Sequence, residues 1–294
     1  MLGHASTEFV AVLSGLQAPE LSVWRFILGS IGLLVVALIL PKSRDLIAPF
    51  RTHGWQLAGL SVLGITIGYL VFHWSFDFAS VPQVATMVTT ILICVALANL
   101  AINRQAIGVG KIVSGLCALA GIALLITAGY LARLAGDADS LVGVMLAAAC
   151  AAAVAIYSVL VRPIIVEYGA LRITTITMFL GALGLWAVVG VFFGIWIEPG
   201  RLMDMPTGAL ASLLTIAFWN TTITQFLWIG GLAAVPDITR GSYLFFLKPV
   251  IATLLAVLVL NQNLTLTQVL AIVIITASVI AEMMVGHWTK LKAT

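Results

Sequence analysis

Long apolar stretches separated by short runs of charged, glycine and proline residues dominate this chain of 294 residues. The interruptions include PKSRDLIAPFRTHG from Pro41, NRQAIGVG from Asn103 and EPGRLMDMPTG from Glu198. Most of the intervening stretches hold about 20 residues, the length with which an α-helix crosses a bilayer core. The pattern predicts an all-α polytopic membrane protein with ten transmembrane helices, at 5–17, 21–40, 54–76, 82–102, 111–131, 141–161, 173–197, 208–232, 242–260 and 264–288.

Composition agrees with this prediction and excludes several classes of protein. Only 9% of the residues are charged and 62% are hydrophobic, whereas soluble domains hold about 25% charged residues. We therefore expect the lipid bilayer as a partner, and the net charge of +3 offers no nucleic-acid surface. The sequence contains no phosphate loop, no HExxH or GxSxG motif and no metal-spaced Cys/His cluster. We expect no cofactor, no metal and no enzyme activity, and no cleavable signal peptide, because MLGHASTEF has no basic start.

Basic residues are unevenly divided between the two sets of alternate loops. Ten of the fourteen Lys and Arg residues follow the even-numbered segments or lie in the C-terminal tail. Arg25, Arg133 and Arg201 fall on the opposite side, and Lys248 lies within the ninth segment. Because basic loops stay cytoplasmic, both termini are expected in the cytoplasm, and we expect a bacterial inner (plasma) membrane protein.

The two halves of the chain resemble each other when it is shifted by about 154 residues. FHWSFDFASVP at 72–82 then lies over FLWIGGLAAVP at 226–236, and five of the eleven positions are identical. GSIG at 29–32 similarly resembles GALG at 181–184. Because a unit of five helices is odd in number, its second copy must enter the membrane from the opposite face. Such inverted repeats are typical of secondary transporters, which bind substrate between the repeats near the membrane midplane.

Two stretches carry a resemblance to a known family: ASVPQVATMVTTILICVALANLAINRQ from Ala79 and KPVIATLLAVLVLNQNLTLTQ from Lys248. They resemble the EamA modules of the drug/metabolite transporter (DMT) superfamily, although Asn261 and Gln262 stand where the family often has Gly-Glu. The resemblance implies ten helices in two inverted five-helix repeats, here 1–134 and 135–294. It also implies a central cavity and, in most members, export of amino acids or other small metabolites.

Polar and aromatic side chains inside the apolar segments are the candidates for substrate binding, because a charge at the bilayer centre costs about 2.5–3.5 kcal/mol on insertion scales. On the third segment Tyr69 and His73 share one helical face. On the eighth, Asn220 and Gln225 need polar partners, which a substrate or a neighbouring helix can supply. Lys248 precedes Pro249 and either binds an anionic substrate group or extends to the membrane surface. The full set of expected binding residues is Tyr69, His73, Tyr157, Trp219, Asn220, Gln225, Tyr243, Phe246 and Lys248.

Two residues are candidates for proton coupling. His73 titrates near neutral pH when it is unperturbed. Glu8 is similar in position to the first-helix glutamate with which related small multidrug pumps exchange proton for drug, although its helix is short. Facilitated diffusion would need neither residue.

Together these observations favour a secondary transporter that exports small metabolites, amino acids or related compounds, by alternating access. Drugs, nucleosides or sugars are the alternative cargo. A membrane-embedded enzyme or a non-transporting protein is the less favoured interpretation. The sequence does not distinguish a monomer from a homodimer.

Overall fold

A computed structural model describes residues 2–79, 84, 87–127, 138–235, 243–260 and 265–291. The described residues are predominantly helical and form no strand. Five helical spans are long and apolar enough to cross a membrane, at 18–39, 48–77, 141–168, 170–193 and 207–231. Four shorter apolar helices and the first helical segment complete the ten segments that the sequence predicts. The protein is therefore an all-α polytopic membrane protein, as predicted.

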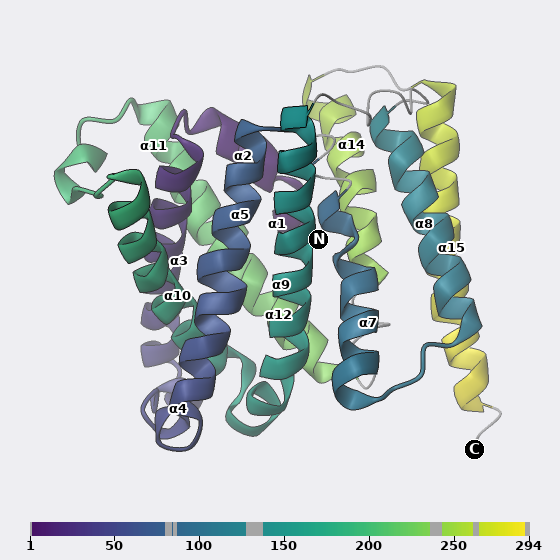
Figure 1. Cartoon of the computed structure of the whole chain (residues 1–294), viewed down its shortest axis with the longest axis horizontal. Coiled ribbons are helices and arrows are strands. Elements are labelled where there is room, and N and C mark those ends of the chain that lie inside the picture. The colour runs from purple at the N-terminus through teal and green to yellow at the C-terminus, as the bar shows by residue number, and fades with distance from the viewer. Residues whose placement is uncertain are drawn as a thin grey trace.

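The helices are named here in chain order (Figure 1). The first repeat holds α1 (Leu2–Ala5), α2 (Thr7–Leu13), α3 (Ala18–Ile39), α4 (Ala48–Ser61), the π-helix η2 (Val62–Ile67), α5 (Gly68–Trp74), α7 (Ile91–Asn103) and α8 (Val109–Thr127). The second holds α9 (Ala138–Tyr168), α10 (Ala170–Phe193), α11 (Thr207–Leu214), the π-helix η6 (Thr215–Ile223), α12 (Thr224–Ala234), the 3₁₀ turn η7 (Tyr243–Phe246), α14 (Leu247–Leu260) and α15 (Leu266–Leu291).

Several helix boundaries differ from the prediction, and the end of the sixth helix is one example. The sequence predicts that the sixth helix ends at 161, before a loop that begins at Arg162, whereas α9 continues through Pro163 to Tyr168. Proline is tolerated inside membrane helices because neighbouring groups satisfy the backbone carbonyl that it leaves unpaired. The helix stops instead before Gly169, whose φ of 92° belongs to the left-handed region that glycine adopts without strain.

The packing of the helices shows that the two halves run in opposite directions (Figure 1). Helix α3 packs along α10, and α8 packs along α15 at one edge of the bundle. Within each pair one helix runs up the view and the other runs down. Helix α9 packs on η2 and α5, while α1 and α2 pack on η6. Corresponding helices of the two halves thus make corresponding contacts, as an inverted repeat requires.

The two π-helices are a second sign of the repeat. A shift of 154 residues places Val62–Ile67 over 216–221, inside η6. Because π-helical turns are rare and frequently mark functional sites, their occurrence at matching positions connects the local geometry to the repeat. The matching π-helices add structural support to the sequence identities between the halves. Two of the identical residues, Pro82 and Pro236, lie outside the described residues.

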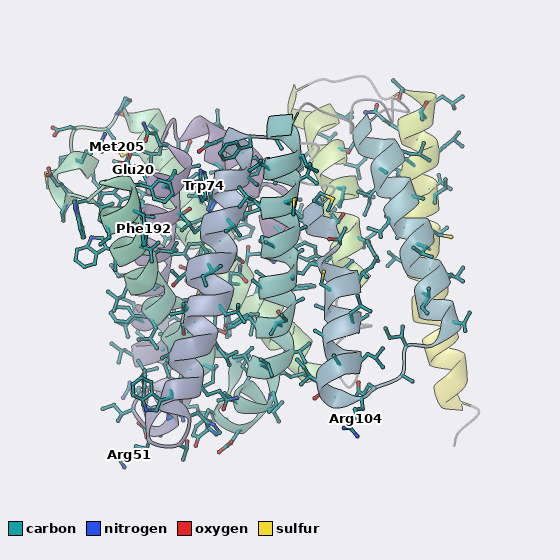
Figure 2. All side chains as sticks on the ribbon, in the orientation of Figure 1. Glu20, Arg51, Trp74, Arg104, Phe192 and Met205 are labelled. Atoms are coloured by element: carbon teal, nitrogen blue, oxygen red, sulfur yellow. The ribbon has the colours of Figure 1, made fainter. Side chains whose placement is uncertain are left out.

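The two ends of the bundle carry different charged groups. Figure 2 shows Arg51 and Arg104 at one end and Glu20 at the other. This arrangement fits the predicted alternation of basic loops, while the orientation across the membrane stays a prediction. Arg25 lies inside α3, as the predicted segment 21–40 places it, and it is only 2% exposed.

Candidate functional site

A cavity lies between the two repeats. The space open to water-sized solutes is about 90 Å³, which is room for roughly six water molecules or more. Its lining residues come from both halves of the chain: His4, Thr7, Arg25, Gly64, Ile65, Tyr69, Phe72, Val88, Ile91, Leu92, Val95, Cys150, Val154, Tyr157, Ser158, Thr174, Met178, Gln225, Trp228, Ile229, Phe245 and Lys248. A site of this kind and location is expected for a solute that is bound between inverted repeats.

One wall is organised by Arg25 of α3. Its Nε donates to Thr221 Oγ1 at 2.7 Å, and its Nη1 lies 3.4 Å from His73 Nε2. The guanidinium carbon is 5.3 Å from the ring centre of Phe26 and 5.6 Å from that of Tyr69. These cation–π distances are short enough to stabilise the charge. Arg25 is therefore positioned by groups from both repeats.

His73 lies behind Arg25 and is not among the residues that line the cavity. Because a guanidinium only donates, Nε2 of His73 accepts, and the ring hydrogen lies on Nδ1. Nδ1 is 3.0 Å from the carbonyl oxygen of Tyr69 and 2.6 Å from Ser22 Oγ. The geometry gives His73 the task of orienting Arg25, and its role in proton coupling stays a prediction.

The other wall is an aromatic cluster beside Lys248. The ring of Phe245 lies 5.1 Å from the His4 ring and 5.3 Å from the Trp228 ring, and His4 and Trp228 meet edge to face at 5.7 Å. Lys248 Nζ lies 5.8 Å from the Phe245 ring centre. We call His4, Trp228 and Phe245 the aromatic wall. It presents flat apolar surface next to a cation.

Gln225 and Tyr157 are two further polar residues of the lining, and each is hydrogen-bonded to another side chain. Gln225 Nε2 donates to the hydroxyl of Tyr69, which joins α12 of the second repeat to α5 of the first. The hydroxyl of Tyr157 is paired with Thr177 Oγ1 at 2.8 Å. The sequence prediction of a binding position is consistent with this placement for Tyr69, Tyr157, Gln225 and Lys248, which all line the cavity.

Two polar atoms of the lining have no hydrogen-bond partner among the residues that the structure describes. They are Nε2 of His4 and Oγ1 of Thr174, on side chains that are 8% and 1% exposed. A buried polar group without a partner costs about 1–3 kcal/mol. Both atoms are therefore available to a water molecule or solute that occupies the cavity.

The remaining predicted binding residues lie elsewhere or outside the described residues. Trp219 is 46% exposed and does not line the cavity. Asn220 is buried and donates to Gly3 O and to Ser6 Oγ, so that it fastens the first helical segment to η6. Phe246 and its neighbour Phe245 both pack in an apolar cluster with residues of α8 and α15, and of the two Phe245 also lines the cavity. The side chains of Tyr243 and Glu8 fall outside the described residues.

Among the lining residues that the sequence does not predict, His4 and Arg25 are the ones with basic side chains. The sequence signal for Arg25 is a lone charge one turn inside an apolar segment. That signal is easily overlooked, because Arg25 is counted together with the basic residues of the loops. His4 has no such signal, because its importance depends on where the short α1 packs. Among the described residues no group of His, Cys, Asp and Glu is arranged to hold a metal ion.

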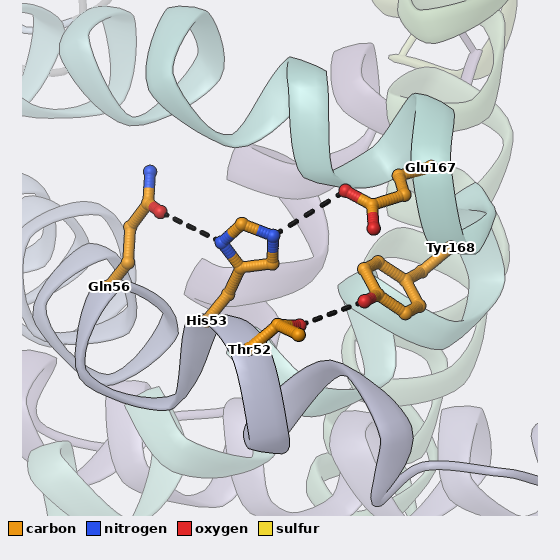
Figure 3. A network of polar contacts seen from close by, with 5 residues as sticks. All are labelled: Thr52, His53, Gln56, Glu167 and Tyr168. Carbon is orange, nitrogen blue, oxygen red and sulfur yellow. Dashed lines mark hydrogen bonds and ion pairs between the residues drawn. The ribbon is translucent and has the colours of Figure 1, made fainter.

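A further polar network lies where the start of α4 meets the end of α9 (Figure 3). His53 Nε2 is 3.4 Å from Glu167 Oε2, and its Nδ1 is 3.1 Å from Gln56 Oε1. Beside it, Thr52 Oγ1 and the hydroxyl of Tyr168 are 2.8 Å apart. These contacts connect the first repeat to the second at the end of the bundle that carries Arg51.

Comparison with known proteins adds three findings. The sequence model described as the EamA-like transporter family matches residues 5–127 and 141–282. A curated relative from Clostridium kluyveri, described as an uncharacterized transporter, is 25% identical over 271 residues, which span 92% of this chain and 85% of the relative. A solved structure titled "Crystal structure of protein" superposes with a TM-score of 0.77 at 15% identity, covering 97% of this chain and 94% of that chain. At that identity the structural likeness supports the fold alone.

Proposed function

Because this chain belongs to the EamA-like transporter family, it is a membrane transporter of small molecules, and we propose that it exports amino acids or related small metabolites by alternating access. The observation that carries this proposal is the cavity between the repeats, whose lining combines cations, unpartnered polar atoms and aromatic rings. The bacterial inner membrane, with both termini in the cytoplasm, is part of the same proposal.

The proposed motion is a rocking of one repeat against the other around the cavity. Two matching contacts supply the sliding surfaces. The GSIG stretch of α3 packs against η6, where Thr222 Oγ1 donates to Gly29 O at 2.8 Å. The GALG stretch of α10 packs against η2, where Thr66 Oγ1 donates to Gly181 O at 3.0 Å. Each contact joins one repeat to the other, and each pairs a small-residue stripe with a π-helix.

The test is counterflow in proteoliposomes that contain the full chain. Vesicles are loaded with an unlabelled amino acid mixture, and labelled members are offered outside one at a time. Transient accumulation of a label identifies a carrier and its substrate class. Absence of accumulation for every amino acid, with the protein shown to be folded, would refute the amino acid proposal. Drugs, nucleosides and sugars would then be tested in the same vesicles.

A further inference from the structure

We propose that the contact between His53 and Glu167 is a pH-sensitive latch that holds the two repeats together at one end of the bundle. The latch consists of the residues in Figure 3: Thr52, His53 and Gln56 of α4, and Glu167 and Tyr168 of α9. Protonation of His53 favours the closed end, and loss of that proton allows the repeats to separate there. The inference rests on the proposed alternating access and adds a regulation to it.

The first step of the argument is the position of the latch between the repeats. Helix α4 belongs to the first repeat and α9 to the second. His53 Nε2 lies 3.4 Å from Glu167 Oε2, and Thr52 Oγ1 lies 2.8 Å from the hydroxyl of Tyr168. Further along the two helices their apolar residues pack in one cluster, which includes Tyr157 of the cavity lining. A separation of the repeats at this end must break the contacts of the latch.

The second step is a break in the regular helix beside each half of the latch. Helix α4 is kinked at His53, whose φ of −123° and ψ of 20° depart from helical values. Helix α9 passes through Pro163 shortly before Glu167, and a proline inside a helix leaves a backbone carbonyl without its hydrogen bond. Helices bend sharply at points of this kind. The short terminal segments 48–52 and 164–168 can therefore change direction while the rest of each helix stays intact.

The third step is the hydrogen bonding of the His53 ring. Both ring nitrogens face oxygen atoms, since Nε2 faces Glu167 Oε2 and Nδ1 lies 3.1 Å from Gln56 Oε1. A neutral imidazole donates with one nitrogen only, whereas an imidazolium donates with both. The charged ring therefore satisfies both neighbours and forms an ion pair. The neutral ring loses one contact unless the amide of Gln56 turns over.

The charges around His53 set the sign of the effect. Of the elements that pack on α4, α9 brings Glu167 and Tyr168 to the ring, and the two aromatic rings meet edge to face at 6.0 Å. Arg172 of α10 donates to a backbone carbonyl of the loop after α3, η2 carries no titratable residue, and α4 itself carries Arg51. Within the described residues, Glu167 is the acid at ion-pair distance from the ring. Because histidine gains its charge as the pH falls from 8 to 5, the latch is strong at low pH and weakens as the pH rises.

The exposure of the pair limits the size of the effect. The side chains of His53 and Glu167 are 29% and 56% exposed, and ion pairs at the surface are weak. We therefore expect the ratio of open to closed molecules at this end to rise about two- to fivefold between pH 6 and pH 8. Glutamate side chains ordinarily protonate below this range, so the change of charge belongs to the imidazole.

The experiment measures the opening of this end without a substrate. Spin labels are attached at positions 55 and 166, whose native side chains are 94% and 67% exposed on α4 and α9. The full chain is used in lipid nanodiscs, with its three cysteines replaced by serine or alanine. Double electron–electron resonance at pH 6 and pH 8 gives the fractions of molecules with the shorter and the longer distance. We expect the longer distance to gain at pH 8, and a ratio that is unchanged or falls would overturn the proposal.

Variants locate the sensor. His53→Gln and Glu167→Gln each remove the ion pair but keep a side chain that forms hydrogen bonds, so each should abolish the dependence on pH. His53→Arg keeps its charge throughout the range and should hold the end closed at pH 8. Glu198→Gln is the matched control, because it removes an exposed carboxylate outside the latch, and it should leave the dependence intact. A dependence on pH that survives in folded His53→Gln would refute the proposal.

The latch and the proposed transport fail in different ways. An opening that depends on pH and is abolished by His53→Gln, with no counterflow of any amino acid, would uphold the latch and refute that cargo. Counterflow of an amino acid, with spin-label distances that are the same at pH 6 and pH 8, would uphold the proposed function and refute the latch.

Discussion

At the residue scale, the site contains some side chains that the sequence predicts and others that it does not. Tyr69, Gln225 and Lys248 are polar groups deep in apolar segments, so the cost of burying them in a membrane is enough to mark them in the sequence. Their placement on the cavity wall follows from the fold. Sequence reasoning does not select Arg25 and His4 as binding residues, because each lies near the start of a segment, where a charge or an imidazole is ordinarily close to water. Only tertiary packing buries them.

Tryptophan replacements separate the aromatic wall from the outer surface. Trp228→Ala removes a ring that contacts His4 and Phe245, and we expect at least a tenfold loss in substrate affinity. Trp219→Ala removes a ring that is 46% exposed and should change affinity less than twofold. Counterflow and the thermal-shift Kd measure both. The assignment of the wall fails if the two variants behave alike.

Asn220 provides a test of a purely structural amide. Its Nδ2 donates to Gly3 O and Ser6 Oγ, and interhelical hydrogen bonds of this kind contribute about 0.6–2 kcal/mol in membranes. We therefore expect Asn220→Leu to lower the thermal midpoint while the Kd of substrate stays within about threefold in the folded fraction. Thr215→Val is the control, because within the described part of the chain its hydroxyl donates to Ala211 O one turn away. A tenfold rise in Kd for Asn220→Leu at unchanged stability would show that Asn220 takes part in substrate binding.

At the scale of elements, the pairing of each GxxG stripe with a π-helix explains how helices of opposite repeats approach so closely. The sequence shows the stripes and the shift between them, since GSIG and GALG are visible as letters. It does not show the π-helices, because an extra residue in a helical turn leaves no periodic signature in a short apolar run. For a similar reason the sequence points to Phe246 rather than Phe245: the 3₁₀ turn η7 changes which side chain faces the cavity.

Glycine replacements test these sliding contacts. A Cβ added at Gly29 would lie 2.8 Å from Thr221 Cγ2 and 3.1 Å from the Ala217 carbonyl oxygen. Overpacking of this kind costs about 1–3 kcal/mol, so Gly29→Ala should lower both the thermal midpoint and the initial counterflow rate. Gly59→Ala is the matched control, since no atom lies within 4 Å of its added Cβ, and alanine favours a helix by up to about 1 kcal/mol. If Gly29→Ala is as stable and as active as Gly59→Ala, α3 and η6 do not form a close sliding surface.

At the scale of the whole molecule, polar contacts join the repeats at both ends of the bundle. At one end Arg201 Nη1 donates to Glu20 Oε1 at 2.9 Å. At the other, His53 lies beside Glu167 (Figure 3). Glu20 and His53 belong to the first repeat, and their partners belong to the second. The fold class and the repeat could be predicted because they depend on segment length and similarity along the chain, whereas these cross-repeat pairs depend on which loop ends meet in space.

Alternating access requires that the two ends separate in turn, and this leads to a cross-linking prediction. Cysteines are placed at positions 20 and 201, or at 53 and 167, in a chain whose three cysteines are replaced by serine or alanine. A short reducible bis-thiol reagent should stop counterflow in either double variant, and reduction should restore it, because a closed end prevents the site from being exposed on that side. The control pair is Asn99 and Gln105, which are bonded within the first repeat at 2.7 Å; its cross-link should leave turnover within about twofold. If only one of the two ends inhibits when it is linked, the cavity is open to a single side, and the chain works by a gate at that end rather than by rocking of the repeats.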